Sequence, residues 1–449
     1  MLFFVALMAC GKNGDSGEVT WHQDVAPIVM EHCAGCHTDG TIAPFALDSY
    51  ESAAPLATAM SAAVDAGRMP PWLAQDTDDC QPLLPWRDDL RLSDDEKAML
   101  RDWADAGAPE GDARRAADLP IPPELSVRDP DVVLPFVNEY LVSGERDDFE
   151  CFVVNPGNTE LKWVEAIQLD PGNPLVDHHG LIFMDADGAG DDLAGEDGVF
   201  PCFNAPNVNG YLMATWTPGA APMTMPEGIA MPLPAGARII VQMHYHPDET
   251  PQTDLSTVSL RYADSTPEWA AAQVLIGNYW RQSGDGTGLQ PGPNDDDGVQ
   301  FLIPAGATDH TETMIYQQSV DYSFPLLTVG THMHYVGTDM KIDIHRANPA
   351  PDQAEDECLI RTPGWDFNWQ RVYQYDAEVR DLPTVSKGDQ LILSCTYDNS
   401  LDNPFVAESL ADLGETDPHD VTLGEETVDE MCLGLFGILV PPAFVENLY

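Results

Sequence analysis

The residues of this chain that could do chemistry fall into five short segments. Cys33, Cys36 and His37 form a Cys-x-x-Cys-His motif, which attaches c-type haem through two thioethers and binds the iron through the histidine. The other four segments supply ligands for two three-ligand copper centres: His178, His179, His244, His332, His334 and Met431. A one-electron iron ahead of two coppers predicts redox chemistry with O2.

One predicted copper centre combines His332, His334 and Met431. The two histidines lie two apart in an expected strand, where alternate residues share a face, so both imidazoles can reach one ion. The thioether is a soft ligand that selects Cu(I) over Zn2+ or Mg2+. This set leaves an open position for O2, and we predict it as the catalytic set, although Met431 taken alone fits a core residue better than a ligand.

The second predicted centre combines His178, His179 and His244. A regular strand would point the adjacent histidines apart, so they need a strand end or a bulge to converge. His246 is near enough in sequence to replace His244. A lone strand histidine can also be structural, and only the joint pattern indicates metal.

The haem motif needs a sixth ligand, and two methionines compete for it. Met69 stands before a proline pair, and Met60 stands in a helix-like segment that better suits core packing. We predict Met69, because a Met/His haem has a raised potential suited to electron transfer. The alternative for the two cysteines is a thioredoxin-like dithiol, which does not need the adjacent histidine.

The composition excludes some partners. The 449 residues hold 20 Lys+Arg against 75 Asp+Glu, a net charge of -55. Such a surface repels nucleic acid phosphates and anionic lipids, so we expect neither as a partner. The acidity suits solubility in salt; Ca2+ binding by Asp191 and Asp192 or by residues 295–297 is the alternative.

The N-terminal segment predicts export. Residues 1–10 form an apolar run that ends in a lipobox-like sequence, so Cys10 is the expected lipidation site and residues 1–17 a signal and tether. A buried strand is the alternative. No internal run is long enough for a membrane helix. Nine cysteines fit an oxidising compartment, and we expect a periplasmic protein or one lipid-anchored to a bacterial envelope.

Residues 18–112 predict a small all-α domain. Ser93 and Glu96 form a capping box, and the helix that follows should end at Gly107. Residues 113–124 are polar and then Pro-rich, as in a linker.

The remainder predicts a mainly β fold. Residues 239–245, 391–395 and 433–440 are short apolar runs bounded by turn residues, which is typical of antiparallel sandwiches. We divide this part into two domains, residues 125–265 and 266–449.

The histidine and methionine motifs resemble those of the copper type II, ascorbate-dependent monooxygenases, the family of peptidylglycine and dopamine hydroxylases. They come in that family's order between about residues 130 and 446: residues 176–180, 242–245, 331–334 and 429–432. The resemblance implies two jelly-roll-like sandwiches, each contributing one copper site. It also implies that the three-histidine site stores electrons and that the site with Met431 binds O2.

The resemblance also bears on the cysteines. It implies a disulfide between Cys395 and Cys432, and Cys151 with Cys202 is the next expected pair. Cys80 and Cys358 remain, either unpaired or bridging domains.

The sequence departs from the family at its peptide-carboxylate clamp. Gly330, Leu433 and Leu435 occupy the places of the family's Arg, Asn and Tyr. No bidentate carboxylate fork is available there, so we expect a small neutral or apolar substrate. The haem domain resembles small cytochrome domains fused to bacterial members of the group.

These observations predict a monooxygenase that hydroxylates a C–H bond with O2, with electrons from a donor relayed through haem c. One alternative is a copper-binding electron-transfer or copper-handling protein that uses the same ligands without turnover. Another is an adhesion module built on a degenerate sandwich, which would have no use for six ligands and a haem motif.

Overall fold

The computed structural model describes residues 17–447 apart from a few gaps, namely residues 40, 42, 124, 145–146, 203–205, 249, 296–297, 352 and 425–427. Cys10 lies outside the described residues. The chain forms two compact units. The helical unit comprises Met1–Pro70 and Leu90–Pro123, and the β unit comprises Pro71–Asp89 and Glu124–Tyr449.

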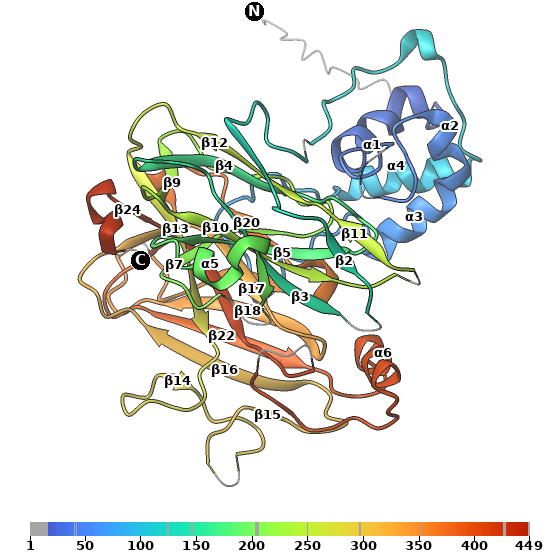
Figure 1. The fold of residues 1–449 in the computed structure, drawn as a ribbon. Coiled ribbons are helices and arrows are strands. Elements are labelled where there is room, and N and C mark those ends of the chain that lie inside the picture. The colour runs from blue at the N-terminus through green and yellow to red at the C-terminus, as the bar shows by residue number, and fades with distance from the viewer. Residues whose placement is uncertain are drawn as a thin grey trace, which may run out of the picture. The chain divides into compact units, whose positions relative to one another are not determined.

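The described residues of the helical unit form helices and no strand (Figure 1). In chain order these are η1 (Trp21–Val25), α1 (Ala26–His32), α2 (Tyr50–Ala53), η2 (Ala54–Leu56), α3 (Ala57–Asp65), α4 (Asp94–Asp105) and η3 (Ala113–Arg115). The predicted capping box begins α4: Ser93 Oγ accepts from the Glu96 N–H, and the Glu96 carboxylate accepts from the Ser93 N–H at 2.7 Å. The helix ends just before Gly107, as the sequence predicts.

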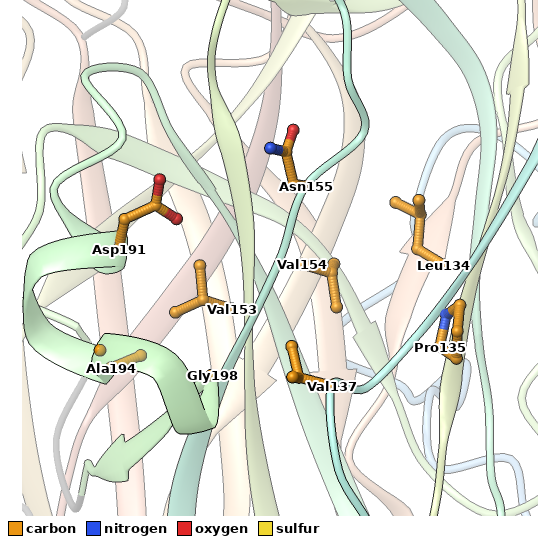
Figure 2. A pocket seen from close by; sticks show the side chains of 10 residues that line it. Leu134, Pro135, Val137, Val153, Val154, Asn155, Asp191, Ala194 and Gly198 are labelled. Carbon is orange, nitrogen blue, oxygen red and sulfur yellow. The ribbon is translucent and has the colours of Figure 1, made fainter.

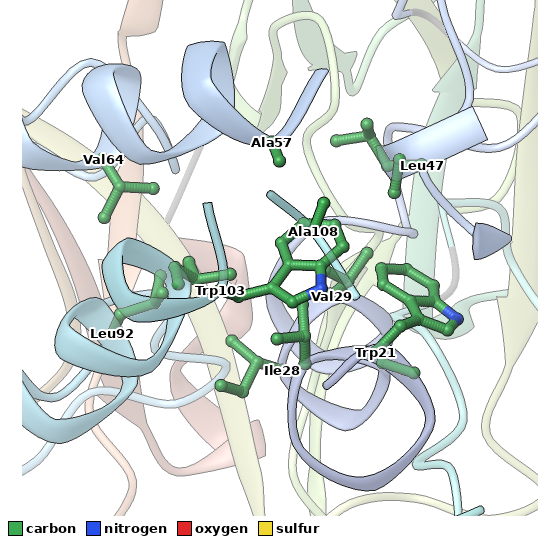
Figure 3. Packing of buried hydrophobic residues seen from close by; sticks show 13 residues of the cluster. Trp21, Ile28, Val29, Leu47, Ala57, Val64, Leu92, Trp103 and Ala108 are labelled. Atoms are coloured by element: carbon green, nitrogen blue, oxygen red, sulfur yellow. The ribbon is translucent and has the colours of Figure 1, made fainter. Parts of the chain in front are cut away.

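Two tryptophans form the centre of the helical unit (Figure 3). The Trp21 and Trp103 ring centroids lie 5.6 Å apart, and the Trp103 indole donates to the Pro109 carbonyl at 3.1 Å. Val29 of α1 packs into the same cluster, and Cys33 lies against it. The helix that precedes the haem motif is therefore fixed by burial of its apolar face.

The β unit begins with strands that carry the first histidine set. Its elements up to residue 262 are β1 (Val132–Pro135), β2 (Tyr140–Val142), β3 (Asp148–Val154), β4 (Lys162–Asp170), β5 (Asp177–Asp185), α5 (Gly190–Ala194), η4 (Gly195–Asp197), β6 (Val199–Pro201), β7 (Gly210–Trp216), β8 (Met223–Thr224), β9 (Ile229–Leu233), β10 (Arg238–Tyr245), β11 (Gln252–Asp254) and β12 (Thr257–Tyr262).

The second half carries the other set. Its elements are β13 (Trp269–Gly277), β14 (Gly288–Leu289), β15 (Leu302–Ile303), β16 (His310–Gln317), β17 (Phe324–His332), β18 (Gly337–His345), β19 (Asp356–Thr362), η5 (Phe367–Trp369), β20 (Val372–Gln374), η6 (Val379–Asp381), β21 (Thr384–Val385), β22 (Gln390–Tyr397), α6 (Pro404–Leu413), β23 (Val421–Thr422), β24 (Leu433–Val440) and η7 (Pro442–Asn447).

The mainly β prediction is confirmed, and the three apolar runs form β10, β22 and β24. Among the described residues, one fifteen-stranded sheet includes β5, β10, β13, β17 and β24, and a five-stranded sheet has the order β14-β16-β22-β18-β19. Along β22, buried and half-buried residues alternate, as in a strand with one face on a core. β10, between β3 and β5, is buried along almost its whole length.

The compact units differ from the predicted domain boundaries. Residues 71–89 were expected in the helical domain but belong to the β unit, where Cys80 is bonded to Cys358. Residues 113–123, expected as a linker, belong to the helical unit. The boundary near residue 266 does not separate compact units either, because β13 pairs with β7 and β9 before it and with β24 after it.

The described cysteines form three disulfides. The two expected pairs, Cys151–Cys202 and Cys395–Cys432, are both present, and the third joins Cys80 to Cys358. Three disulfides fit a protein that matures in an oxidising, exported environment. In the part of the chain that the structure describes, no helix is both long and apolar enough to cross a membrane.

Candidate functional site

A bulge brings the adjacent histidines of β5 to one point. In the antiparallel pairing of β5 with β10, His244 is opposite His179 and Tyr245 is opposite Asp177, so His178 is the extra residue. A bulged residue leaves the strand's alternation. The bulge that the sequence required is therefore present at His178, and it allows both imidazoles to meet His244.

The three imidazoles converge through the same ring atom. The Nδ1 atoms of His178, His179 and His244 lie 3.2 Å from one another in all three pairs. A triangle with these sides has its centre about 1.8 Å from each corner (3.2/√3). A metal at about 2 Å from each nitrogen, an ordinary metal–imidazole distance, would therefore lie just outside their plane. These residues form a group able to hold a metal ion.

The outer nitrogens of this set have their own partners. His244 Nε2 lies 2.8 Å from Asp147 Oδ2, and His178 Nε2 lies 2.8 Å from Asn368 Oδ1. An acceptor at Nε2 fixes the proton there and leaves the Nδ1 lone pair for a metal, the usual arrangement around metal-binding histidines. His246, the alternative to His244, instead places its Nδ1 2.8 Å from the other Asp147 oxygen.

Burial keeps two of these imidazoles, those of His178 and His179, neutral. It lowers the pKa of His178 to about 4, with a further contribution from the His244 charge. Burial and the surrounding imidazoles hold the pKa of His179 well below its ordinary value, and His332 and His334 are among those imidazoles. Although burial opposes it, hydrogen bonds from His244 and His246 hold the pKa of Asp147 low. His178 and His179 are thus unprotonated at neutral pH and able to bind a cation.

The second histidine pair presents the opposite ring atoms. His332 ends β17, and its Nδ1 lies 2.7 Å from Gln370 Oε1. His334 Nδ1 lies 3.2 Å from the Asp429 carbonyl oxygen. Both acceptors draw the ring proton to Nδ1, which leaves Nε2 for a metal. The two ring centroids lie 5.2 Å apart, and burial lowers the pKa of His332 to about 4.

Strand pairing and one buried carboxylate bring Met431 next to these histidines. β17 pairs with β24 so that His332 is opposite Leu433. Glu430 Oε1 accepts from the backbone N–H groups of both His334 and Met431. Burial raises the pKa of Glu430 to about 8, although these N–H groups oppose the shift. The backbone of Met431 is therefore beside that of His334, and binding of metal by its sulfur stays a prediction.

Gly277 permits this approach. It has a φ of 131°, and a Cβ there would lie 2.2 Å from the Cys432 carbonyl oxygen. The next residue, Asn278, donates its N–H to that oxygen at 3.0 Å and accepts from the Cys432 N–H at 2.9 Å. With the Cys395–Cys432 disulfide, these contacts fix the start of β24 just after Met431.

Phe367 lies between the two histidine sets. Its ring centroid is 6.1 Å from that of His179 and 6.1 Å from that of His334. It also lies 6.0 Å from His178 and 4.6 Å from Tyr335. The rings of His179 and His334 are therefore no farther apart than 12.2 Å, the sum of the first two distances. The sets are neighbours, although His179 and His332 are 153 positions apart in the sequence.

The Cys-x-x-Cys-His motif lies in the helical unit, directly after α1. His37 Nδ1 lies 3.1 Å from the Phe45 carbonyl oxygen, which leaves Nε2 for an iron. Cys33 and Cys36 form no disulfide, and burial raises the pKa of Cys33 to about 12. Such a thiol is not the low-pKa nucleophile of a redox dithiol.

The two candidates for the sixth haem ligand, Met60 and Met69, lie in different surroundings. Met60 packs against the hydrophobic core of the helical unit. Met69 is half-buried and follows α3, with its N–H donating to the Ala63 carbonyl. The role of Met69 as the sixth ligand stays a prediction.

A pocket of about 270 Å³ lies elsewhere in the β unit (Figure 2). It is lined by Val153, Val154 and Asn155 at the end of β3, about 17 Å along that strand from Phe149, which pairs with His244. Its one charged side chain, Asp191, is paired with Arg238 at 2.6 Å. The pocket therefore lies apart from the histidine sets, and Asp191 is accounted for by an ion pair.

Sequence reasoning missed the residues that hold the ligands in place: Asp147, Asn368, Gln370, Phe367 and Glu430. Asp147 and Gln370 lie in loops and Asn368 lies in the single turn η5, and none of them belongs to a motif. Glu430 stands next to Met431 at the start of an apolar run, and that position was the one signal that could have marked it.

Comparisons with known proteins add little. No family model and no curated protein matches the chain. Among solved structures, it is similar to a recombinant N-glycanase F, with a TM-score of 0.28 and 9% identity over 69% of this chain and 95% of that chain. PNGase F from Flavobacterium meningosepticum, a glycosylasparaginase, matches with a TM-score of 0.23 and 9% identity, over 68% of this chain and 89% of that chain. Such weak likeness carries no argument.

Proposed function

We propose that this protein is a copper-dependent monooxygenase that hydroxylates a C–H bond of a small, neutral or apolar substrate with O2. The observation that carries the proposal is the convergence of three Nδ1 atoms at 3.2 Å on a strand bulge. Three converging imidazoles, two of them with hydrogen-bonded outer nitrogens, suit a transition metal. Bound copper would supply one-electron transfer and O2 activation.

The two ligand sets support different roles for two ions. The first set is all imidazole, and His244 is almost fully buried. The second would add the thioether of Met431, a ligand that favours Cu(I), the oxidation state that reacts with O2. We therefore assign electron storage to His178, His179 and His244, and the catalytic role to the set with Met431.

The remaining parts of the proposal concern the chain as a whole. We propose that the helical unit is a c-type cytochrome domain in which Cys33, Cys36 and His37 hold haem and Met69 is the sixth ligand. The β unit would be two jelly-roll-like sandwiches that share a sheet. Cys10 would carry a lipid that anchors the protein to the bacterial envelope. An external donor would reduce the haem.

The substrate class follows from the strands around the second set. Gly330 and Leu435 are opposite each other in the β17–β24 pairing, and Leu435 is buried in an apolar cluster. Neither position offers a cation for a carboxylate. The lining there favours a substrate without charge.

The test uses full-length protein matured with haem and copper. Metal analysis should give two copper and one haem per chain. After anaerobic reduction, mixing with O2 should reoxidise the haem, and an accepted substrate should accelerate this step only when copper is present. Haem reoxidation that is independent of both copper and substrate would refute the proposal.

A second candidate is a copper-handling or electron-transfer protein without turnover. The Phe367 ring between the two sets favours it, because a filled space leaves less room for a substrate. Copper-dependent O2 uptake across a panel of neutral substrates would separate the candidates, since a carrier should show none.

A further inference from the structure

One short segment contacts both histidine sets. Residues 365–370 join β19 to β20 and include the single turn η5. Asp366 begins that turn by accepting from the Asn368 N–H at 2.9 Å. No motif in the sequence marks this segment as functional, and the proposed function does not require it.

The segment provides one hydrogen-bond acceptor to each set. Asn368 Oδ1 lies 2.8 Å from His178 Nε2, and Gln370 Oε1 lies 2.7 Å from His332 Nδ1. Only one residue separates these two amides in the chain. Each fixes the proton on the outer nitrogen of a ligand and leaves the inner nitrogen for a metal.

Two aromatic side chains strengthen the connection. Phe367 is 5% exposed and lies within 6.1 Å of His179 and His334, one from each set, between ring centroids. The Trp365 indole donates to the His334 carbonyl oxygen at 3.2 Å. A shift of this turn would therefore displace ligands in both sets.

Hydrogen bonds inside the segment, and others to neighbouring parts of the β unit, also hold it in place. Gln370 Nε2 donates to the Phe367 carbonyl oxygen at 3.1 Å, so the amide that binds His332 is fixed to the same turn. The Trp365 N–H donates to the Thr338 carbonyl at 2.9 Å, and Thr217 Oγ1 donates to the Gln370 carbonyl at 3.3 Å. Packed and hydrogen-bonded segments move as units, which is the physical requirement for coupling between two sites.

We propose that residues 365–370 couple the two metal sites, with Asn368 and Gln370 as positioning residues and Phe367 as the packed contact between them. This inference rests on the proposed function only in requiring that both sets bind copper. Metal at either set fixes its histidines, and through the segment it orders the other set. Each site then binds copper more tightly when the other is filled, and the effect is equal in both directions.

The experiment measures Cu(I) affinity of the full-length chain by competition with a chromophoric Cu(I) chelator. The first-set affinity is compared between the wild type, with its second site filled, and His334→Ala, in which that site is broken. We expect the first-set affinity to be about fivefold higher or more in the wild type, the usual scale of coupling between sites. His332→Ala repeats the comparison independently, should His334→Ala fold poorly.

Two variants at Asn368 test whether residues 365–370 cause this difference in copper affinity. Asn368→Leu has nearly the same volume but cannot accept the His178 proton, and it should reduce the coupling ratio to about one and weaken the first set about 10- to 100-fold. Asn368→Asp restores an acceptor and should restore both. Gln370→Met and Gln370→Glu test the other side in the same way. Asn209→Leu, at an exposed asparagine whose side chain bonds to Asp187, is the control and should change neither.

The outcomes separate the two proposals. Two bound coppers with a wild-type ratio of one, or a ratio that persists in Asn368→Leu, would refute the coupling and leave the proposed function standing. Fewer than two coppers on the wild type would refute both.

Discussion

The two histidine sets are held in place in different ways. In the first, neighbouring strands β5 and β10 place the ligands, and a bulge at His178 completes the set. In the second, the ligands lie at or beyond strand ends, and Gln370, Asp429 and Glu430 hold them by hydrogen bonds. The first set offers Nδ1 and the second Nε2. Sheet register thus preorganises one site, whereas loop contacts build the other.

This difference predicts a first set that tolerates little change in its ligands. Replacing His244 with Ala removes one of three converging nitrogens, so copper affinity at that set should fall about a thousandfold, and stoichiometry from two to one at micromolar copper. Equilibrium dialysis with metal analysis measures this.

The control for that prediction is His246→Ala. His246 lies two residues away and shares Asp147, but its Nδ1 binds that carboxylate instead of joining the triad. Two coppers should remain. If His246→Ala lost a copper and His244→Ala kept both, the assignment of the third ligand would be wrong.

Copper binding at the second set should depend more on the nearby disulfide between Cys395 and Cys432. Serine at both Cys395 and Cys432 removes the disulfide that fixes the start of β24, and should lower the free energy of unfolding by about 3 kcal/mol. It should also weaken copper binding at the set with Met431 and leave the first set unchanged. Urea unfolding and Cu(I) competition give the two values.

Removal of the Cys151–Cys202 bridge is the matched comparison. It should destabilise the fold by a similar amount without affecting the second set, because this bridge joins β3 to the residue after β6 and includes neither β17 nor the residues next to Met431. Equal loss of second-set copper in both double variants would show that global stability, and not local constraint, governs this site.

Loss of the hydrogen bond between Asp147 and His244 should weaken copper binding at the first set, but less than loss of a ligand does. Asp147→Leu removes the acceptor at His244 Nε2, so copper affinity there should fall about 10- to 100-fold while the second set is unaffected. Chelator competition on the two variants Asp147→Leu and Asp147→Asn measures this, and the asparagine should lose less because it can still accept. Unchanged affinity in Asp147→Leu would mean that strand geometry alone orients His244.

Because His332 is buried, the free energy of unfolding should fall as the pH is lowered. Its pKa is lowered to about 4 in the fold, against about 6.5 in the unfolded chain, so above pH 6.5 it is neutral in both states. Between pH 6.5 and 4 only the unfolded chain takes the proton, and stability falls. From pH 7 to 5 the metal-free wild type should lose about 2 kcal/mol more than His332→Gln in urea unfolding. Equal losses would contradict this.

The sequence predicted which histidines converge in the first set better than it predicted what surrounds them. His178, His179 and His244 were grouped correctly, and the need for a bulge followed from their adjacency, because strand alternation forbids two neighbours on one face. The apolar runs at β10, β22 and β24 were recognisable because burial of one or both faces dictates their composition.

The domain boundaries, and the residues that hydrogen-bond to the histidines, could not be predicted from local sequence patterns. The pairing of β13 with β24 joins residues far apart in the chain, and no local pattern encodes it. Residues 71–89 lack periodicity, and their place in the β unit depends on a disulfide to Cys358. Asn368 and Gln370 are ordinary loop amides in the sequence, and only the fold brings them to His178 and His332.

Anomalous diffraction at the copper edge, on crystals of the copper-loaded full-length protein, tests the central claim most directly. Two peaks should appear in the β unit. One should lie about 2 Å from the Nδ1 atoms of His178, His179 and His244, and the other about 2 Å from Nε2 of His332 and His334, with the Met431 sulfur bound to it. A single peak, or a second copper with the Met431 sulfur turned away, would contradict the account.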